Sequence, residues 1–331
     1  MLDDLLEQYG HHLVVLRGLT KRSVGDYQRR VSLFFDWLNQ DGRTTAIESV
    51  TREDVEAWLK HLYYDRRNGT YTRHTKLGAL SGFWRFLVYE KLATEDITAQ
   101  IPRPRIKPKM IQYFTRGEVI KFFEASPPTT EKGLRDTCIL IVMAFAGLRV
   151  GELCGLRLAD LVDDGHYVDI LVNEEIGKQG HSRAVDLWAA PAVFIRRWLN
   201  VRITQGAKID DPLFVSYRKN DQLVGRRLSG NDIDRLVKEL ATAAGVRKPR
   251  IHSHMFRATH GSDLLFVRGF TIAAIAARLG HKNIATTDRY LPRRGRVNQE
   301  YRSLRDYWRT WEQLYTQGGA TSVEGREQGT D

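Results

Sequence analysis

Three prolines divide this chain of 331 residues into two parts. The segment IPRPRIKPKM, residues 101–110, holds all three of them within seven positions. A proline cannot continue a helix, and it also drives the residue before it into extended backbone. The segment therefore predicts an extended linker. Two domains of about 100–200 residues each fit the flanking stretches, residues 1–100 and 111–295.

Residues 1–100 have the apolar spacing of a helical domain. One face of residues 20–40 is apolar at every third or fourth position, as an amphipathic helix requires. That face consists of Val24, Tyr27, Val31, Phe34, Phe35 and Leu38. A second helix is predicted to begin at Thr51, because Asp54 completes a capping-box pattern. A third helix is predicted over residues 70–92.

Residues 111–295 mix helical and strand patterns. Two β-rich stretches, residues 166–172 and 183–189, flank turn residues and predict a β-hairpin with Lys178 near its tip. An apolar helix breaks at Gly147, and a short second helix follows it. Further helices are predicted at 115–126, 191–204, 230–243, 254–266 and 271–279. The expected fold is therefore mainly α with a small β-hairpin, as a helical domain followed by an α+β domain.

The last part of the chain predicts an amphipathic helix and a tail. Residues 296–317 carry an apolar stripe with spacings of four and three. The stripe consists of Val297, Tyr301, Leu304, Trp308, Trp311 and Tyr315. Such a helix docks either on its own chain or on a neighbouring protomer. The small polar residues of 318–331 predict a disordered tail.

The charge of the chain is strongly positive, since 51 Lys and Arg face 40 Asp and Glu. This excess favours nucleic acid over a membrane surface, because neutralised phosphates release counterions. The two cysteines exclude a disulfide framework and a zinc knuckle. The N-terminus lacks a signal-peptide pattern, and the longest apolar run, 11 residues from Cys138, is too short to span a bilayer. We expect a soluble, cytoplasmic protein.

Basic side chains gather at two places that suit a phosphate backbone. One is the start of the helix at residues 70–92, where the helix dipole also favours an anion. The other is the linker. The predicted contacts to DNA are Arg73, Lys76, Arg103, Arg105, Lys107 and Lys109. The alternatives are a solvated basic face and a solvated linker.

Six side chains are suited to handling phosphate and protons. They are Arg149, Lys178, His254, Arg257, His281 and Tyr290. Arg149 follows the helix break, and His254 and Arg257 share one helix face at i, i+3. Arginine presents a rigid fork that matches two phosphate oxygens. Histidine transfers protons near neutral pH.

Each of these side chains also has an ordinary explanation. Arg149 could pair with Glu152, Lys178 could be a solvated turn residue, and Tyr290 could be a surface aromatic. Another alternative is a metal site built from His252, His254 and His260. Its spacing is not that of the HExxH motif, and no carboxylate cluster accompanies it.

The set as a whole has one coherent chemical use. Two guanidiniums, one ammonium and two imidazoles can stabilise a pentacoordinate phosphorane while a phenolate attacks. The cations also lower the pKa of the phenol. Because they do what two metal ions do in polymerases, we expect neither a metal nor another cofactor.

Four motifs, in this order, make the chain resemble the tyrosine recombinase (phage-integrase) family. They are GLRVGEL, GKQGHSR, HMFR and LGHKNIATTDRY. The likeness covers residues 10–292, and it implies a core-binding domain, a linker and a catalytic domain. It also implies a site-specific recombinase that cleaves and rejoins DNA through a 3′-phosphotyrosyl link, without metal or ATP.

The resemblance implies a role for each side chain. Arg149 and Arg257 would hold the non-bridging oxygens of the scissile phosphate. Lys178 would protonate the leaving 5′ oxygen, and His254 would handle the proton of the tyrosine hydroxyl. His281 would donate a hydrogen bond to the phosphate, and the tyrosine would attack.

The sequence departs from the family's pattern at Phe256 and Ala258, and in the hairpin at Gln179 and His181. None of these changes removes a catalytic group, and they leave the subfamily open. We expect no arm-binding domain ahead of residue 10, and this expectation favours an Xer-like or transposon-type recombinase over a two-site phage integrase.

The resemblance also implies partners. These are double-stranded DNA with specific recombination sites, a homo-tetramer with exchange of the C-terminal helix, and a partner recombinase or DNA-bending protein. The expected setting is the bacterial nucleoid. The alternatives are a topoisomerase with the same chemistry, a non-enzymatic DNA-binding protein, and a metal-dependent nuclease.

Overall fold

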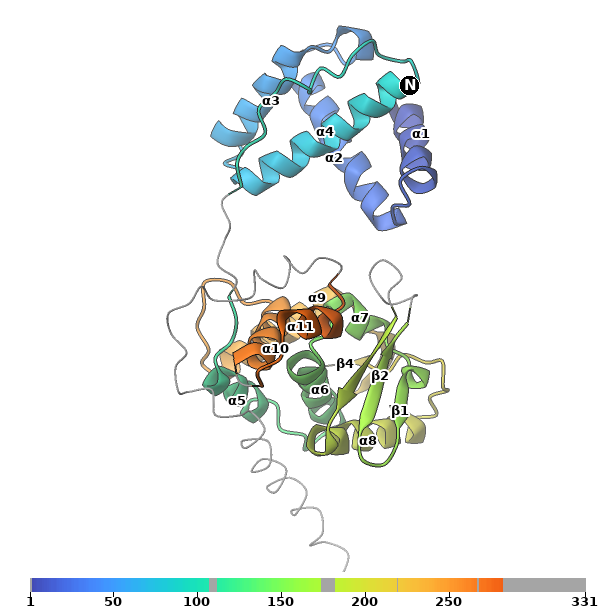
Figure 1. Cartoon of the computed structure of the whole chain (residues 1–331), viewed down its shortest axis with the longest axis vertical. Coiled ribbons are helices and arrows are strands. Elements are labelled where there is room, and N and C mark those ends of the chain that lie inside the picture. The colour runs from blue at the N-terminus through green and yellow to red at the C-terminus, as the bar shows by residue number, and fades with distance from the viewer. Residues whose placement is uncertain (1, 107–111, 174–181, 219, 267, 282–331) are drawn as a thin grey trace, which may run out of the picture. The chain divides into compact units, whose positions relative to one another are not determined.

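The computed structural model describes residues 2–106, 112–173, 182–218, 220–266 and 268–281. The chain folds as two compact units, Met1–Lys109 and Met110–Asp331 (Figure 1). The predicted C-terminal helix at 296–317 and the tail at 318–331 lie outside the described residues. No helix in the described ranges is both long and apolar enough to cross a membrane.

The first unit is built of α-helices. They are α1 (Leu2–Val15), α2 (Lys21–Gln40), α3 (Arg52–Tyr64) and α4 (Thr70–Tyr89), with a 3₁₀ turn at Ile47–Ser49. The predicted apolar face of α2 is buried except for Tyr27, which is half-buried, and α2 packs against α1, α3 and α4. The capping box of Thr51 and Asp54 is present at the start of α3. The prediction of an N-terminal helical domain is therefore confirmed.

Aromatic rings fill the core of this unit. The rings of Phe34 and Trp58 meet edge to face with centroids 5.2 Å apart, and Trp84 stacks on Phe35 at 6.1 Å. All four side chains are buried. Aromatic burial and edge-to-face contacts contribute stability that a small helical unit needs.

The start of the predicted linker packs on this unit. Ile101 is buried in its core, and Arg103 donates a hydrogen bond to the Ser81 hydroxyl at 3.3 Å. The carbonyl of Pro104 lies 3.1 Å from Nδ1 of His74. The segment is therefore anchored over its first residues, while Lys107 and Lys109 lie outside the described part.

In its described residues, the second unit combines helices with two small sheets. Its helices are α5 (Arg116–Glu124), α6 (Glu131–Ile141), α7 (Val150–Gly155), α8 (Ala189–Thr204), α9 (Gly230–Ala243), α10 (His254–Phe266) and α11 (Ile272–Leu279). One antiparallel sheet has the order β1 (Leu161–Asp163), β2 (Val168–Val172), β3 (Arg183–Leu187). The other pairs β4 (Val215–Tyr217) with β5 (Leu223–Arg227).

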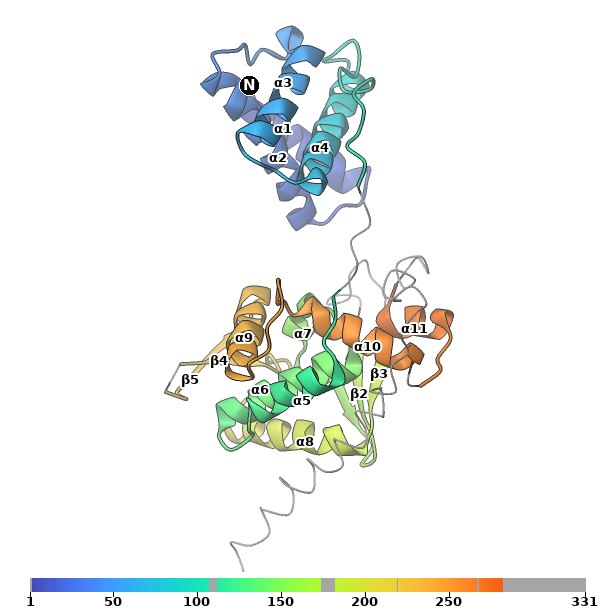
Figure 2. The same ribbon diagram turned by 90° about the vertical axis from the view of Figure 1, so that its left-hand side faces the viewer.

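Strands β2 and β3 pair with Ile170 opposite Val185, which confirms the predicted antiparallel pair. The connection that carries Lys178, residues 174–181, lies outside the described residues. Strand β1 and the β4–β5 pair were not predicted. The predicted fold class, mainly α with a small β component, is confirmed (Figures 1 and 2).

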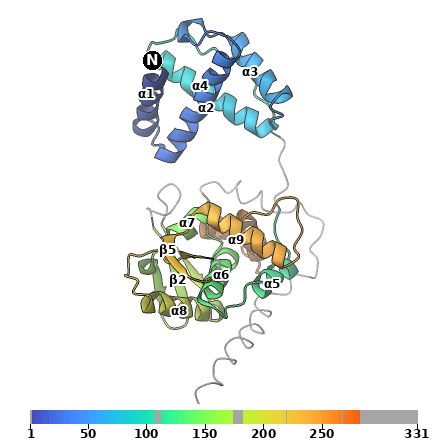
Figure 3. The ribbon, with the colours of Figure 1, turned by 180° about the vertical axis from the view of Figure 1, so that it is seen from behind.

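A buried helix lies at the centre of this unit. α6 packs against α8 and continues into a π-helical turn, Val142–Ala146, which contacts α10 and β3 (Figures 2 and 3). Every residue from 137 to 146 is buried. This rigid apolar element ends at Gly147, so the residues that follow it emerge from a fixed point in the core.

Candidate active site

The helix break predicted at Gly147 is real and requires glycine. Gly147 adopts left-handed backbone with φ of 62°, where an L side chain is strained. A Cβ atom there would also lie 2.5 Å from Cδ2 of His260 and 3.1 Å from a methyl group of Leu279. The π-helical turn before it had no signal in the sequence, and such turns often occur at functional sites.

Replacing Gly147 with alanine is therefore expected to lower the free energy of unfolding by about 2–5 kcal/mol, from backbone strain plus overpacking. Gly245 is a matched control, because it has φ of 63° and its added Cβ would meet nothing within 4 Å. Gly245→Ala should cost only the backbone part, about 1–2 kcal/mol. Urea unfolding of both variants measures the difference, and equal losses would contradict the close approach to His260.

Arg149 lies two residues beyond this glycine, at the N-cap of α7. Its Nη1 donates to Oε1 of Glu152 at 2.6 Å, and its backbone N–H donates to Oε2 at 2.8 Å. The ion pair considered from the sequence is thus present. The guanidinium also donates through Nη2 to the carbonyl of Gly280 at 2.6 Å, which holds it at the C-terminal end of α11.

Arg257 reaches the same place from α10. It is 1% exposed, and Nη1 donates to the carbonyl of Gly147 at 2.7 Å while Nη2 donates to the carbonyl of Leu279. The two predicted arginines, 108 positions apart in the sequence, therefore bind adjacent carbonyls of one helix end. Their forks make a compact positive site, as anion binding requires.

Two imidazoles complete this cluster. His281 directly follows Gly280, whose left-handed backbone ends α11. Burial, followed by the charges of Arg257 and Arg149, lowers the pKa of His281 to about 4. The His254 residue is exposed at the surface, yet the packing around its ring and then the charge of Arg257 lower its pKa to about 4. Both rings are neutral at pH 7.

The described residues thus bring together four of the six predicted side chains. They are Arg149, His254, Arg257 and His281, from three separate segments of the second unit: the start of α7, helix α10 and the end of α11. Lys178 and Tyr290 lie outside the described residues. Their roles stay predictions.

The histidines considered for a metal site are arranged differently. His260 is buried, and its Nδ1 lies 3.0 Å from the carbonyl of Ala144 in the π-helical turn. The rings of His252 and His254 stack with centroids 6.4 Å apart. Within the described part of the chain, no three His, Cys, Asp or Glu side chains are grouped so that they could hold a metal ion.

Sequence reasoning missed one arginine of this site. Arg183, the first residue of β3, donates to both carboxylate oxygens of Glu152, at 3.2 and 2.7 Å. Its Nε donates to the carbonyl of Arg278 at 2.9 Å. In the sequence it looks like an ordinary basic residue beside a turn. Only its position at the end of the GKQGHSR motif could have drawn attention to it.

The predicted DNA contacts of the first unit are partly buried by aromatic rings. The guanidinium of Arg73 lies 4.7 Å from the ring centroid of Tyr63, and the ammonium of Lys76 lies 5.6 Å from that of Trp58. Burial also lowers the pKa of Lys76. Arg103 and Arg105 are exposed. Cation–π contacts of this kind orient the basic groups.

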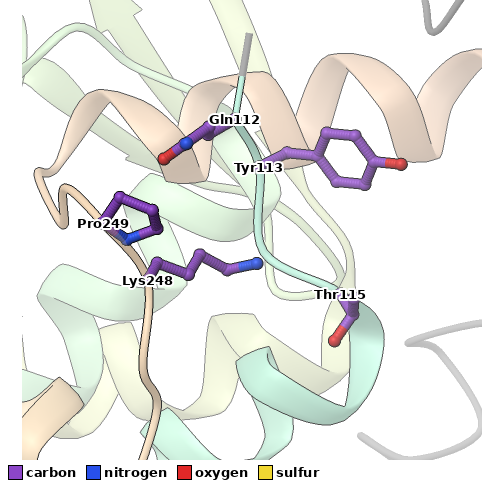
Figure 4. Close-up of a pocket in the computed structure, with 5 residues that line it drawn as sticks. All are labelled: Gln112, Tyr113, Thr115, Lys248 and Pro249. Atoms are coloured by element: carbon purple, nitrogen blue, oxygen red, sulfur yellow. The ribbon is translucent and has the colours of Figure 1, made fainter. Parts of the chain in front are cut away.

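The second unit also has a pocket with a different set of lining residues. It is lined by Gln112, Tyr113, Thr115, Lys248 and Pro249, and it contains none of the predicted catalytic residues (Figure 4). Nζ of Lys248 pairs with Oε2 of Glu118 at 3.0 Å. The ammonium group of Lys248 in this pocket is therefore already paired with a carboxylate.

Comparison with known proteins gives the chain its family. The model of the phage integrase family matches residues 112–294, and that of the phage integrase N-terminal SAM-like domain matches residues 6–91. The tyrosine recombinase XerD of Bifidobacterium longum is 27% identical over 296 residues, which cover 86% of this chain and 91% of XerD.

Solved structures have the same fold. The XerH site-specific recombinase bound to palindromic difH substrate, in a post-cleavage complex, superposes with a TM-score of 0.67 at 19% identity over 83% of this chain and 77% of XerH. A lambda integrase tetramer bound to a Holliday junction gives a TM-score of 0.66 at 18% identity over 90% and 79%. The chain therefore belongs to the phage integrase family, the tyrosine recombinases, which are enzymes that cleave and rejoin DNA strands.

Proposed function

We propose that this chain is a site-specific DNA recombinase that works through a covalent 3′-phosphotyrosyl intermediate, with Tyr290 as the nucleophile. The observation that supports it most is the meeting of Arg149, His254, Arg257 and His281 at the end of α11. Tyr290 follows nine residues after His281. The proposed nucleophile thus lies a short distance after this site in the sequence.

In the proposed reaction, Arg149 and Arg257 bind the non-bridging oxygens of the scissile phosphate and stabilise the phosphorane. A neutral His254 accepts the proton of the tyrosine hydroxyl, and an incoming phosphate anion raises the low imidazole pKa towards the value that this task needs. His281 donates a hydrogen bond to the phosphate. Lys178 protonates the 5′ oxygen as the phosphodiester bond breaks.

The phosphotyrosyl bond conserves the energy of the broken phosphodiester. A 5′ hydroxyl of a second strand attacks it, the tyrosine leaves and regains its proton, and the strands are rejoined without ATP. The arginines and the lysine supply the positive charge for which other enzymes use metal ions. No metal is therefore required in this proposal.

We assign DNA binding to residues 1–100 together with the linker 101–110, and catalysis to residues 111–295. XerH and lambda integrase were solved on DNA, the latter as a tetramer. By analogy, we propose that this chain assembles as a homo-tetramer on paired sites in the bacterial nucleoid. The same proposal includes exchange of the C-terminal helix between protomers and the action of an accessory protein.

The test is a cleavage assay on nicked duplex DNA from the native locus, with chelator present. The nick lets the short leaving strand diffuse away, so a covalent adduct accumulates and is seen on a denaturing gel. We expect the adduct with and without chelator. Cleavage that chelator abolishes would indicate a metal-dependent nuclease, and relaxation of plasmids lacking the site would indicate a topoisomerase. DNA binding that never gives an adduct would contradict the proposal.

A further inference from the structure

Three arginines from three elements hold the last carbonyls of α11. Arg183 of β3 binds the carbonyl of residue 278, Arg257 of α10 binds that of residue 279, and Arg149 binds that of residue 280. Carbonyls at a helix C-terminus lack partners within the helix and carry partial negative charge. The helix end therefore orders the three guanidiniums side by side.

Glu152 connects two of these arginines. It is 1% exposed, and each of its oxygens accepts one hydrogen bond from Arg149 and one from Arg183. The distances to Arg149 are 2.6 and 2.8 Å, and those to Arg183 are 3.2 and 2.7 Å. The carboxylate is thus shared between two cations, and the three groups together keep a positive charge.

We propose that Arg183 is a positioning residue for the strand-cleavage reaction, acting on Arg149 through Glu152; this role rests on the proposed function. With Arg183 in place, the carboxylate divides its charge, and Arg149 keeps positive potential for a phosphate. Arg149, Glu152 and Arg183 together have a net charge of +1. Without Arg183, the remaining pair of Arg149 and Glu152 is neutral. Glu152 then turns fully onto Arg149 and draws its fork away from the phosphate.

The site also offers a matched control for a merely structural role. Arg278 ties the same two elements together, because its Nη1 pairs with Oδ1 of Asp186 at 2.5 Å and its Nη2 donates to the Asp186 carbonyl at 2.9 Å. Among the described contacts, neither Arg278 nor Asp186 touches Glu152 or Arg149. Removing Arg278 therefore weakens the junction of α11 and β3 without changing the charge shared with Arg149.

The experiment compares Arg183→Gln with Arg278→Gln and wild type in single-turnover cleavage of the nicked native site. Two substrates are used: normal DNA, and DNA with a methylphosphonate at the scissile position. The methylphosphonate is neutral, so it depends less on the charge of Arg149. For Arg183→Gln we expect cleavage of normal DNA to fall about 100-fold, the scale of a misplaced catalytic group, with DNA affinity within about twofold. On the methylphosphonate, the loss of cleavage rate should be less than a tenth as large as on normal DNA.

Each outcome bears on the role of Arg183. Arg278→Gln should lose the same factor on both substrates, since it affects only packing. An Arg183→Gln protein that cleaves at the wild-type rate, or that loses the same factor on both substrates, would overturn the role while leaving the proposed function intact. Wild-type protein that forms no adduct on either substrate would overturn both.

A second variant guards against misfolding. Arg183→Lys keeps the charge but cannot span both oxygens of Glu152 and the carbonyl of residue 278. We expect it to fold, as judged by circular dichroism and thermal melting, and to recover part of the loss on normal DNA. A cleavage rate on normal DNA that is lower for Arg183→Lys than for Arg183→Gln would contradict the charge-sharing argument.

Discussion

Arg257→Lys is expected to cleave its DNA site about 100- to 1,000-fold more slowly than wild type, the usual effect of removing one preorganised donor. Arg257 is 1% exposed and spans the carbonyls of Gly147 and Leu279. Arginine does this with five N–H donors in a planar fork, whereas lysine has three donors on one nitrogen. Lysine can satisfy the carbonyls or the phosphate, but it cannot satisfy both.

Arg202 provides the control, because it is another buried arginine of the same unit. It is 5% exposed and donates to Oε1 of Gln205 at 2.9 Å and to the carbonyl of Pro212 at 3.1 Å. Arg202→Lys should lose stability but cleave normally once folded. Single-turnover rates measured well below each variant's melting temperature separate the two effects. Equal rate losses would mean that Arg257 matters only for packing.

Glu152→Gln is expected to lower the free energy of unfolding by about 3–5 kcal/mol, the cost of breaking a buried charge network. The variant leaves Arg149 and Arg183 close together without the carboxylate between them. Burial alone would raise the pKa of the Glu152 carboxyl, but hydrogen bonds and charge from Arg183, and then from Arg149, hold that pKa below its ordinary value. The ionised form is therefore the stabilising one.

Because the pKa of Glu152 is lowered, the loss of unfolding free energy in Glu152→Gln depends on pH. The carboxylate contributes its full stability above the ordinary pKa of 4.5, and the contribution is lost as pH falls through the lowered pKa of the folded state. Urea unfolding of wild type and Glu152→Gln should thus differ most at neutral pH and converge below pH 4.5. A difference that stays constant with pH would contradict the charge network.

Asp160→Asn is the matched control for this carboxylate. Asp160 is also buried, and it accepts hydrogen bonds from the backbone N–H of Arg157 at 2.8 Å and from Asn173 at 3.0 Å, but its ion pair with Nη2 of Arg157 spans 3.6 Å. Its replacement should cost less, because one looser ion pair is lost instead of two tight ones. A loss as large as that of Glu152→Gln would show that burial alone, without the shared arginines, sets the cost.

The sequence predicted those parts of the fold that local patterns determine. Helix α2 buries the face marked by its apolar spacing apart from the half-buried Tyr27, and α3 begins at the capping box of Thr51 and Asp54. The strands missed have weak local signals, since β1 is only 3 residues long and β5 is exposed at every residue. A strand without a buried face does not need to alternate apolar and polar residues, so the sequence pattern does not reveal the strand.

The candidate site was predictable where a motif names its residues. Arg149, His254, Arg257 and His281 were found by residue type and order, and the structure brings them together. Arg183 was not found, because its partners Glu152 and Arg278 are 31 and 95 positions away in the sequence. Contacts of that range depend on the tertiary fold, and no local pattern encodes them.

The central claim is that Tyr290 forms the covalent bond to DNA. Wild type and Tyr290→Phe are incubated with nicked DNA from the native locus in the presence of chelator, and the products are run on a denaturing gel. The Phe variant lacks only the hydroxyl that attacks, so it should bind the DNA as tightly as wild type. An adduct for wild type and none for Tyr290→Phe is the predicted result. An adduct of equal yield from both proteins would contradict the account, because the attacking residue would then lie elsewhere.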